Sequence, residues 1–501
     1  MKNTATNKMK FLTAVMAIAS FATTICAQDP LAPQTGTMKG AVLKGRAPVN
    51  KEILRVKLPK AEEATLKNGL RVIVLENHRV PTFSMEMVVM SGGLSDPADL
   101  HGLAGATATL LREGTAKHTS RELAEQLDTI GATIGANSGL ASFTTSVTSA
   151  GLVENFDQVL ALFSEVIRTP KFATDEVERY KSRTVSSQGQ IRGSATFLAQ
   201  ERLNQAIYGT HPASLVLPPA DGIRKLTPAD LMRFHDENYV PNNAMIAIAG
   251  DVTLKEILPK LEGAFGDWKS GAAPKTVIPA APAQSASKIY LINRPGSVQT
   301  VFQIGALGIE RTDPDYAALA VMNRILGGGG SSRLFLNIRE DKSYAYSVSS
   351  NFNSSKYRGT FVANAPVRTD ATEGALREFM SEFNRIRNEK VSANELENAK
   401  RSIVGGFALS LENPAGRLQN IITQKLYNLP ANYWDTYPQK VESITVDDVQ
   451  RVAQKYIDLG HLQIVAVGDA TKTREILAKF GTVEEYDADG KPARTAAKTG
   501  Q

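Results

Sequence analysis

The chain repeats itself, and this repetition limits its fold more than any other feature of the sequence. Residues Leu226–Leu231 correspond to Ile444–Val449, and in each copy a Thr precedes an acid by three residues, as at the first turn of a helix. A short β-rich run ending in Gly-Asp then follows in both copies. Thr445 lies 218 residues after Thr227, and Gly468 lies 218 residues after Gly250. Equal offsets across a helix and a strand predict a duplicated domain.

Each copy mixes strand patterns with helix patterns. Short apolar or alternating runs predict strands, and long stretches with one apolar face predict helices. A capping box over Ser392–Glu395 opens a further helix. The sequence therefore predicts an α+β fold with two homologous domains, each a sheet covered by helices. The expected strands include Arg71–Leu75, Phe83–Met90, Phe143–Val147 and Thr300–Gly305, and the expected helices include Glu122–Ile130, Asn155–Arg168, Tyr316–Ile325 and Thr372–Arg387.

Stretches rich in Pro, Gly and Ala divide the chain. Two domains agree with its 501 residues, since single cores stop growing near roughly 250–300 residues. The expected segments are a leader (1–27), a linker or arm (28–60), a first domain (61–270), a linker (271–287), a second domain (288–482) and a disordered tail (483–501).

The leader resembles a secretory signal. Lys8 and Lys10 supply its positive end, Phe11–Ala22 supplies a short apolar stretch, and cleavage is expected after Ala27. The apolar stretch is shorter than a membrane span. We expect a periplasmic protein of a Gram-negative bacterium. Lipidation at Cys26 is the alternative, and Ile25 before it fits poorly where a small residue is wanted.

The composition excludes several classes of function. Cys26 is the only cysteine, so removal of the leader also removes disulfides, thiolate nucleophiles and Cys-ligated zinc. The chain has 57 Lys and Arg against 51 Asp and Glu, and these charges are interspersed. No basic stripe suited to nucleic acid is present.

An ordered set of short motifs resembles the M16 metallopeptidases, the family of pitrilysin, insulin-degrading enzyme and mitochondrial processing peptidase. The resemblance covers about residues 62–480 and implies LuxS/MPP-like metallohydrolase domains arranged as half of a clam-shell. The motifs that carry it are Leu66–Val72, Ser91–Asp96, Gly102–Ala104, Tyr208–Pro212 and Asn238–Asn243 in the first half, and Leu326–Phe335 and Ile338–Glu340 in the second.

The zinc motif of this family is degenerate here. Active members carry His-x-x-Glu-His, in which two His one helical turn apart bind Zn²⁺ and the Glu activates water. The resemblance aligns these positions with Gly105, Ala108 and Thr109, while the flanking Gly114-Thr115 is intact. The later helix offers Tyr180 or Ser186-Ser187 where a third ligand, a Glu, is wanted. We therefore expect no metal or other cofactor in this chain, and no peptidase activity of the chain alone.

A second family feature is retained. The resemblance implies that Arg339 and Tyr346 bind the substrate backbone and stabilise the tetrahedral intermediate, chemistry that suits a guanidinium and a phenol. Tyr344 is the rival for the role of Tyr346, because residues two apart on a strand share a face. Loss of the zinc ligands with retention of this pair resembles the zinc-free chain of two-chain bacterial members. The implied partners are a zinc-bearing M16 subunit and an extended or unfolded peptide.

Some assignments stay open. Gly328, Gly329 and Gly330 belong either to a substrate-contacting loop or to a tight lead into a helix; a phosphate cradle is disfavoured because the P-loop pattern is missing. His101, with Asp96 and Asp99, is expected to be a solvated loop residue.

The chain as a whole also has alternatives. It could be a non-catalytic peptide-binding or scaffold protein, or a metallopeptidase with unrecognised ligands.

Overall fold

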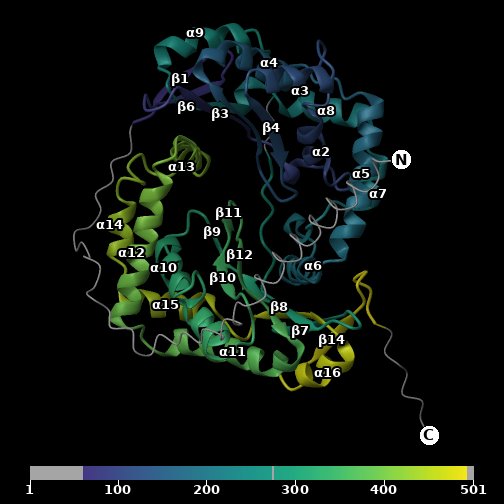
Figure 1. Ribbon diagram of the computed structural model, residues 1–501, viewed down its shortest axis with the longest axis vertical. Helices are drawn as coiled ribbons and strands as arrows, with labels where there is room; N and C mark the ends of the chain where they lie inside the picture. Colours follow the sequence, from purple (N-terminus) through teal and green to yellow (C-terminus); the bar gives the residue numbers. More distant parts are fainter. Residues whose placement is uncertain (1–59, 273–275, 494–501) are drawn as a thin grey trace, which may run out of the picture. The chain divides into compact units, whose positions relative to one another are not determined.

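Two six-stranded sheets follow one another in the computed structural model, which describes residues 60–272 and 276–493 (Figure 1). All of these residues belong to one compact unit. Each sheet is covered by helices, which confirms the predicted α+β class with two homologous domains. The expected leader, 1–27, and nearly all of the expected arm, 28–60, lie outside the described residues.

The first sheet has the strand order β1-β2-β6-β3-β5-β4. Only β2 and β6 run parallel; the other neighbours are antiparallel. Its strands are β1 (Glu62–Thr65), β2 (Arg71–Glu76), β3 (Thr82–Val89), β4 (Thr133–Ser138), β5 (Thr145–Leu152) and β6 (Ala244–Gly250). The helices of this half are α2 (Leu103–Leu110), α3 (Ser120–Thr129), α4 (Phe156–Arg168), α5 (Thr174–Arg192), α6 (Ala195–Tyr208), α7 (Ala220–Lys225), α8 (Pro228–Asn238) and α9 (Leu254–Phe265).

The second sheet repeats this order. From one edge to the other it runs β14-β7-β13-β8-β12-β10, and each strand except β14 follows its counterpart by about the same offset as the sequence motifs. The strands of this half are β7 (Lys288–Asn293), β8 (Gln299–Leu307), β9 (Ile309–Glu310), β10 (Ser349–Phe352), β11 (Ser354–Ser355), β12 (Thr360–Arg368), β13 (Gln463–Gly468) and β14 (Val483–Tyr486). The helices are α10 (Tyr316–Leu326), the π-helical segment η5 (Phe335–Asp341), α11 (Thr372–Asn388), α12 (Ala393–Ser410), α13 (Pro414–Leu426), α14 (Tyr437–Glu442), α15 (Val446–Tyr456) and α16 (Ala470–Ala478).

The two halves exchange one helix each. Strand β6 is buried on both faces, and the face away from its own core packs on α13 of the second half through Ile421 and Ile422. In return, α6 packs on β8 and β13 of the second sheet through Leu203 and Ile207. Figure 1 shows α13 beside β6 and β3, and α6 beside β8. Each fully buried aliphatic side chain stabilises this contact by about 1.5–3 kcal/mol. Each half thus covers one face of its own sheet, and a helix of the other half covers the second face.

Capping residues begin the repeated helices as the sequence predicts. Thr227 and Thr445 each accept a hydrogen bond from the backbone N–H three residues on, at Asp230 and Asp448, and both pairs form complete capping boxes. Ser392 and Glu395 form the same arrangement at α12. These predictions are confirmed because capping depends only on local sequence.

The segment between the halves has no regular secondary structure over residues 276–287. It is held by side chains of the first half: the hydroxyls of Thr276 and Ser95 are 3.0 Å apart, and a ring nitrogen of His211 lies 3.2 Å from the carbonyl oxygen of Pro279. The predicted tail from 483 was wrong for Val483–Tyr486, which form β14 on the free edge of β7. Backbone pairing with β7 outweighs the polar side chains of this segment.

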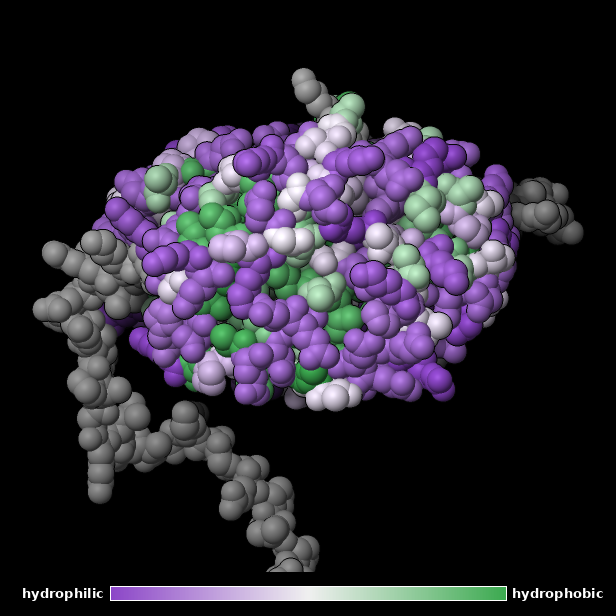
Figure 2. Space-filling view, turned by 90° about the horizontal axis from the view of Figure 1, so that it is seen from above, coloured by the Kyte–Doolittle hydropathy of each residue, from purple (hydrophilic) through white to green (hydrophobic). Residues whose placement is uncertain are grey.

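Seen from above, over α4 and α9, the surface is mostly hydrophilic, and hydrophobic residues show between hydrophilic ones (Figure 2). None of the helices in the described part of the chain combines the length and apolarity that membrane crossing requires.

Candidate functional site

Arg339 and Tyr346, which the sequence singles out, lie in contact. Arg339 stands near the end of η5, and its guanidinium carbon is 5.1 Å from the centroid of the Tyr346 ring. The same carbon is 4.6 Å from the centroid of the Phe335 ring, so the guanidinium contacts two aromatic rings. The side chain of Tyr346 is 83 % exposed. The arrangement places a cation and a phenol together at the surface.

Tyr344 does not share this position. It packs against the second core, and a Cβ added at Gly374 would be 2.7 Å from its hydroxyl oxygen. The segment is not a continuous strand: Ser343 has a positive φ of 53°, Ala345 forms an isolated bridge with Val367, and Tyr346 follows in a bend. The two-residue periodicity of a strand therefore does not apply, and the tyrosines separate into a core residue and a surface residue.

The glycine run before η5 is tightly packed at its start and open at its end. A Cβ at Gly327 would be 2.3 Å from Ser350 Oγ, and one at Gly328 would be 2.8 Å from the Cα of Arg324. Arg324 also donates to the carbonyl of Gly328. At Gly330 the nearest atoms to such a Cβ belong to the Phe335 ring, at 3.8 Å. The close contact with Arg324 therefore explains why glycine occupies positions 328 and 329. Gly330 lies beside the Phe335 ring, which contacts Arg339.

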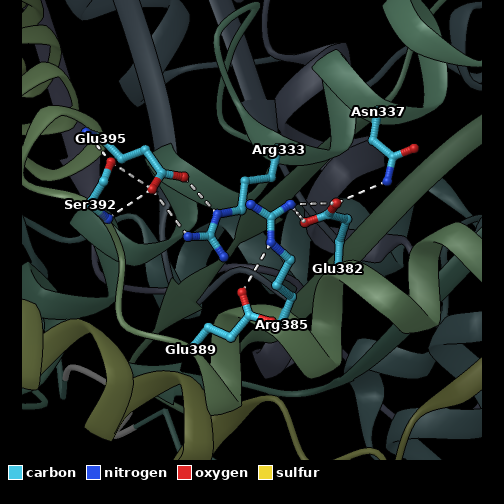
Figure 3. A network of polar contacts seen from close by, with 7 residues as sticks. All are labelled: Arg333, Asn337, Glu382, Arg385, Glu389, Ser392 and Glu395. Carbon is cyan, nitrogen blue, oxygen red and sulfur yellow. Dashed lines mark hydrogen bonds and ion pairs between the residues drawn. The ribbon is translucent and has the colours of Figure 1, made fainter.

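A polar network fixes η5 to its neighbours (Figure 3). Arg333, whose side chain is 6 % exposed, donates to Glu395 at 2.7 Å from Nε and 3.2 Å from Nη2. Burial of Glu395 opposes ionisation, but the hydrogen bonds from Arg333 and Ser392 hold its pKa down at about 2. Because Glu395 also caps α12, the segment before Arg339 is joined to the start of that helix.

The other end of the network joins η5 to α11. Asn337 donates to Glu378 and Glu382, each at 2.9 Å. Glu382 is buried and accepts from Arg385, which also pairs with Glu389. Arg339 therefore projects from a segment held on both sides, which limits the orientations of its guanidinium.

The degenerate zinc positions lie on α2 and bring no ligands together. Ala108 is 0 % exposed, and Thr109 donates its hydroxyl to the carbonyl of Gly105 at 2.8 Å. A Cβ at Gly105 would lie 3.2 Å from the carbonyl oxygen of Ser138 on β4, so this strand occupies space beside the helix. Small residues and an internally bonded hydroxyl do not fit a zinc ion.

The expected third position also has no ligand. On α5, Tyr180 packs against the first core and Ser187 donates to the carbonyl of Thr184 at 2.9 Å, while Ser186 is exposed. Among residues 60–272 and 276–493, His, Cys, Asp and Glu nowhere gather in a group of three that could hold a metal ion.

Asp96 is half-buried and hydrogen-bonded, whereas the sequence predicted a solvated loop residue. Its carboxylate accepts from the backbone N–H groups of Gly102 at 2.7 Å and Ala104 at 2.8 Å, at the start of α2. Burial raises the pKa of Asp96 to about 7, against the effect of these hydrogen bonds, which lower it. The Asp96 carboxylate satisfies backbone N–H groups at the N-terminus of α2, and it forms no metal-binding group with His101 and Asp99 among the described residues.

Sequence reasoning missed Phe335 and Arg333. The four-residue spacing between Phe335 and Arg339 in a helical stretch was a usable signal for a contact. Nothing local indicated Glu395 as the partner of Arg333, because 62 residues separate them.

Two family models and several curated proteins match this chain. Residues 71–218 match the family described as Insulinase (Peptidase family M16), and residues 225–403 match the Peptidase M16 inactive domain. A "non-peptidase homolog YmxG" of Helicobacter pylori is 24% identical over 438 residues, covering 86% of this chain and 96% of that protein. An "uncharacterized zinc protease YmxG" of Bacillus subtilis is 23% identical over 355 residues, covering 71% of this chain and 85% of that protein.

Several solved structures share the fold of this chain. The peptidase M16 inactive domain from Pseudomonas fluorescens superposes with a TM-score of 0.76 at 28% identity, covering 82% of this chain and 98% of that one. A protease from Helicobacter pylori has a TM-score of 0.75 at 21% identity, with coverages of 82% and 100%. The periplasmic protease PqqL from Escherichia coli has a TM-score of 0.68 at 17% identity, covering 84% of this chain and 48% of that one.

Proposed function

The chain belongs to peptidase family M16 as a member that lacks catalytic activity, and we propose that it acts as the zinc-free subunit of a two-chain peptidase. In this role it binds an unfolded peptide and supplies Arg339 and Tyr346 to the zinc site of a partner subunit. One observation carries the proposal: the metal-ligand positions hold Gly105, Ala108 and Thr109, while Arg339 and Tyr346 touch each other at the surface.

The chemistry of the pair supports this role. A guanidinium donates two hydrogen bonds to peptide carbonyl oxygens, and a phenol donates one to an oxyanion that forms during hydrolysis. The chain's own part is to position these donors, and the partner's zinc would polarise the scissile carbonyl and activate water. Exposure of Tyr346 supports a target outside this chain. Gly330, beside Phe335, would allow the substrate backbone to approach, with Gly328 and Gly329 shaping the loop.

We propose that this two-chain peptidase acts in the periplasm. The support is the signal-like leader and the likeness in fold to a protein described as a periplasmic protease. The zinc-bearing M16 partner and this chain would enclose an extended peptide between them as a clam-shell, and the peptide would add to a sheet edge such as that of β4.

Reconstitution tests the proposal. We expect the purified chain to hydrolyse no fluorogenic peptide alone, and to do so when mixed with a subunit that carries His-x-x-Glu-His and is encoded beside it. The Arg339→Ala variant should lower kcat of the mixture. The expected loss of transition-state stabilisation is about 2–4 kcal/mol, as for the removal of an oxyanion donor.

Arg377→Ala is the matched control, because Arg377 is an exposed arginine on α11 paired with Glu373. It should leave kcat unchanged. Full activity of the Arg339→Ala mixture would remove the catalytic role of Arg339.

A non-catalytic peptide-binding or scaffold protein is the second candidate, favoured by the name "non-peptidase homolog" of the Helicobacter relative. This candidate predicts peptide binding without hydrolysis in every mixture. The neighbouring gene separates the two, because only the first candidate requires a zinc-bearing M16 subunit there.

A further inference from the structure

A cavity of about 520 Å³ lies between α6 and the second sheet, away from Arg339 and Tyr346. Its walls are polar but carry no formal charge: among the described residues that line it there is no Lys, Arg, Asp or Glu. Side-chain amides from helix α6, from three strands of the sheet and from the loop after β10 dominate the lining. They belong to Gln200, Asn204, Gln303, Asn351, Asn353 and Asn364.

Gln303 on β8 is the most informative of these residues. Its side chain is on the α6 side of the sheet, the residue is 8 % exposed, and it forms no side-chain hydrogen bond with any described residue. The equivalent position in the first half is Glu86, which accepts a hydrogen bond from Ser146 at 2.7 Å. The second half therefore presents to the cavity an amide that pairs with no described side chain or backbone group, and its donor and acceptor are left for a ligand.

The neighbours of Gln303 leave acceptors free as well. Asn364, its cross-strand partner, donates to Ser349 at 3.2 Å, and Asn204 donates to the carbonyl of Ala213 at 3.3 Å. The carbonyl oxygens of both amides have no donor among the described residues. Tyr357, whose hydroxyl donates to the carbonyl of Ala141, ties the cavity wall to the first half, so the walls are fixed before a ligand arrives.

We propose that this cavity binds a neutral saccharide. Every hydroxyl of a sugar ring both donates and accepts, and every side-chain amide carries a donor and an acceptor, so the two sets match. An ionised ligand, such as a nucleotide, would lose its hydration without meeting an opposite charge. The volume lies in the usual range for small-molecule sites.

A peptide fits the cavity less well. Recognition of a peptide backbone by a sheet pairs with the rim of an edge strand. Here Asn351 on the edge strand β10, and Gln303 and Asn364 on the inner strands β8 and β12, line the cavity with side chains from the face of the sheet. Aliphatic peptide side chains would find few aliphatic partners, because Leu215 and Val362 are the large aliphatic residues of the lining and its other large apolar surfaces are the rings of Tyr208 and Tyr357. The proposal does not depend on a partner subunit or on hydrolysis.

Binding of the full chain to a glycan array of neutral and acidic oligosaccharides, followed by calorimetry with maltotriose and triacetylchitotriose, tests this assignment. We expect neutral glycans to be retained and acidic ones not. Gln303→Leu should weaken binding by about tenfold or more, the effect of one lost buried hydrogen-bonding group. Its thermal midpoint should stay close to that of the native chain, because the Gln303 amide pairs with no described residue.

Two further variants complete the test. Asn364→Val, on the neighbouring strand, should also weaken binding, and Gln158→Leu, the same kind of change at an exposed position of α4, should have no effect. The proposal is overturned if no neutral glycan is retained, or if Gln303→Leu and Asn364→Val bind with native affinity. Retention of an unfolded peptide in place of glycans, sensitive to Gln303→Leu, would make the cavity a peptide site.

Discussion

Glu395 shows how a single carboxylate can set part of the pH dependence of this fold. Its pKa is about 2 in the folded chain, against an ordinary value of 4.5, because Arg333 and Ser392 donate to it. Between these two pKa values the unfolded chain binds more protons than the folded chain. The stabilisation that Glu395 contributes is therefore fully present above about pH 5 and is lost as the pH falls toward 2.

The Glu395→Gln variant should reveal this contribution. It keeps a capping side chain but removes the charge opposite buried Arg333, so we expect a loss of about 1–2 kcal/mol at pH 7, reduced by the partial exposure of Glu395. Urea unfolding from pH 7 to pH 2.5 measures it, and the difference from the native chain should shrink as the pH falls. Glu397→Gln, on the exposed side of α12, should change stability by less than about 0.5 kcal/mol. A difference independent of pH would contradict this account.

At the scale of elements, the duplication makes a quantitative prediction about helix caps. Thr227→Ala and Thr445→Ala remove equivalent caps from α8 and α15, and each should cost about 1 kcal/mol of unfolding free energy. The two sites share no contacts, so the double variant should cost the sum. Chemical denaturation checks this, with Thr→Ser at each site as a control that keeps the cap. Strongly unequal losses of unfolding free energy in the two single variants would show that the repeats are not equivalent at these helices.

Helix α2 lacks the space for zinc-binding side chains as well as the side chains themselves. The combined substitutions Gly105→His, Ala108→Glu and Thr109→His restore the family's motif, but a His side chain at 105 starts 3.2 Å from the Ser138 carbonyl and a Glu at 108 is buried. We expect a loss of stability above about 2 kcal/mol and no stoichiometric zinc by mass spectrometry.

Gly263→His is the control for this variant, because a Cβ at this glycine of α9 meets nothing within 4 Å. It should leave stability nearly unchanged. A stable triple variant with one zinc per chain would mean that α2 still has room for the catalytic site.

Local features of the fold could be predicted from the sequence, and long-range ones could not. The caps at Thr227 and Thr445 and the strands around Arg71 and Phe83 depend on nearby residues, and the structure has them. Ser343 has a positive φ and Tyr346 lies in a bend, and neither residue type signals such a backbone in the sequence. The apolar faces of α6 and α13 predict burial, but amphipathicity does not say which sheet a helix covers.

At the scale of the molecule, the exchanged helices make the halves interdependent. A fragment of residues 60–272 lacks α13 and exposes the outer face of β6, and a fragment of residues 276–493 lacks α6. We expect each fragment alone to bind a hydrophobic dye and to lack cooperative unfolding, and the two to regain both properties when co-expressed. Near-ultraviolet circular dichroism and thermal scans test this. A fragment that unfolds cooperatively by itself would show that its own helices suffice.

The reciprocal contact of α6 and α13 has the form of a two-fold interface in which the same surface is used twice. Residues 271–287 join what would otherwise be two protomers, so the local concentration of one half around the other is set by tether length and not by the amount of protein present. Dilution therefore cannot separate the halves, and each copy is free to lose chemistry that the other, or a second chain, provides.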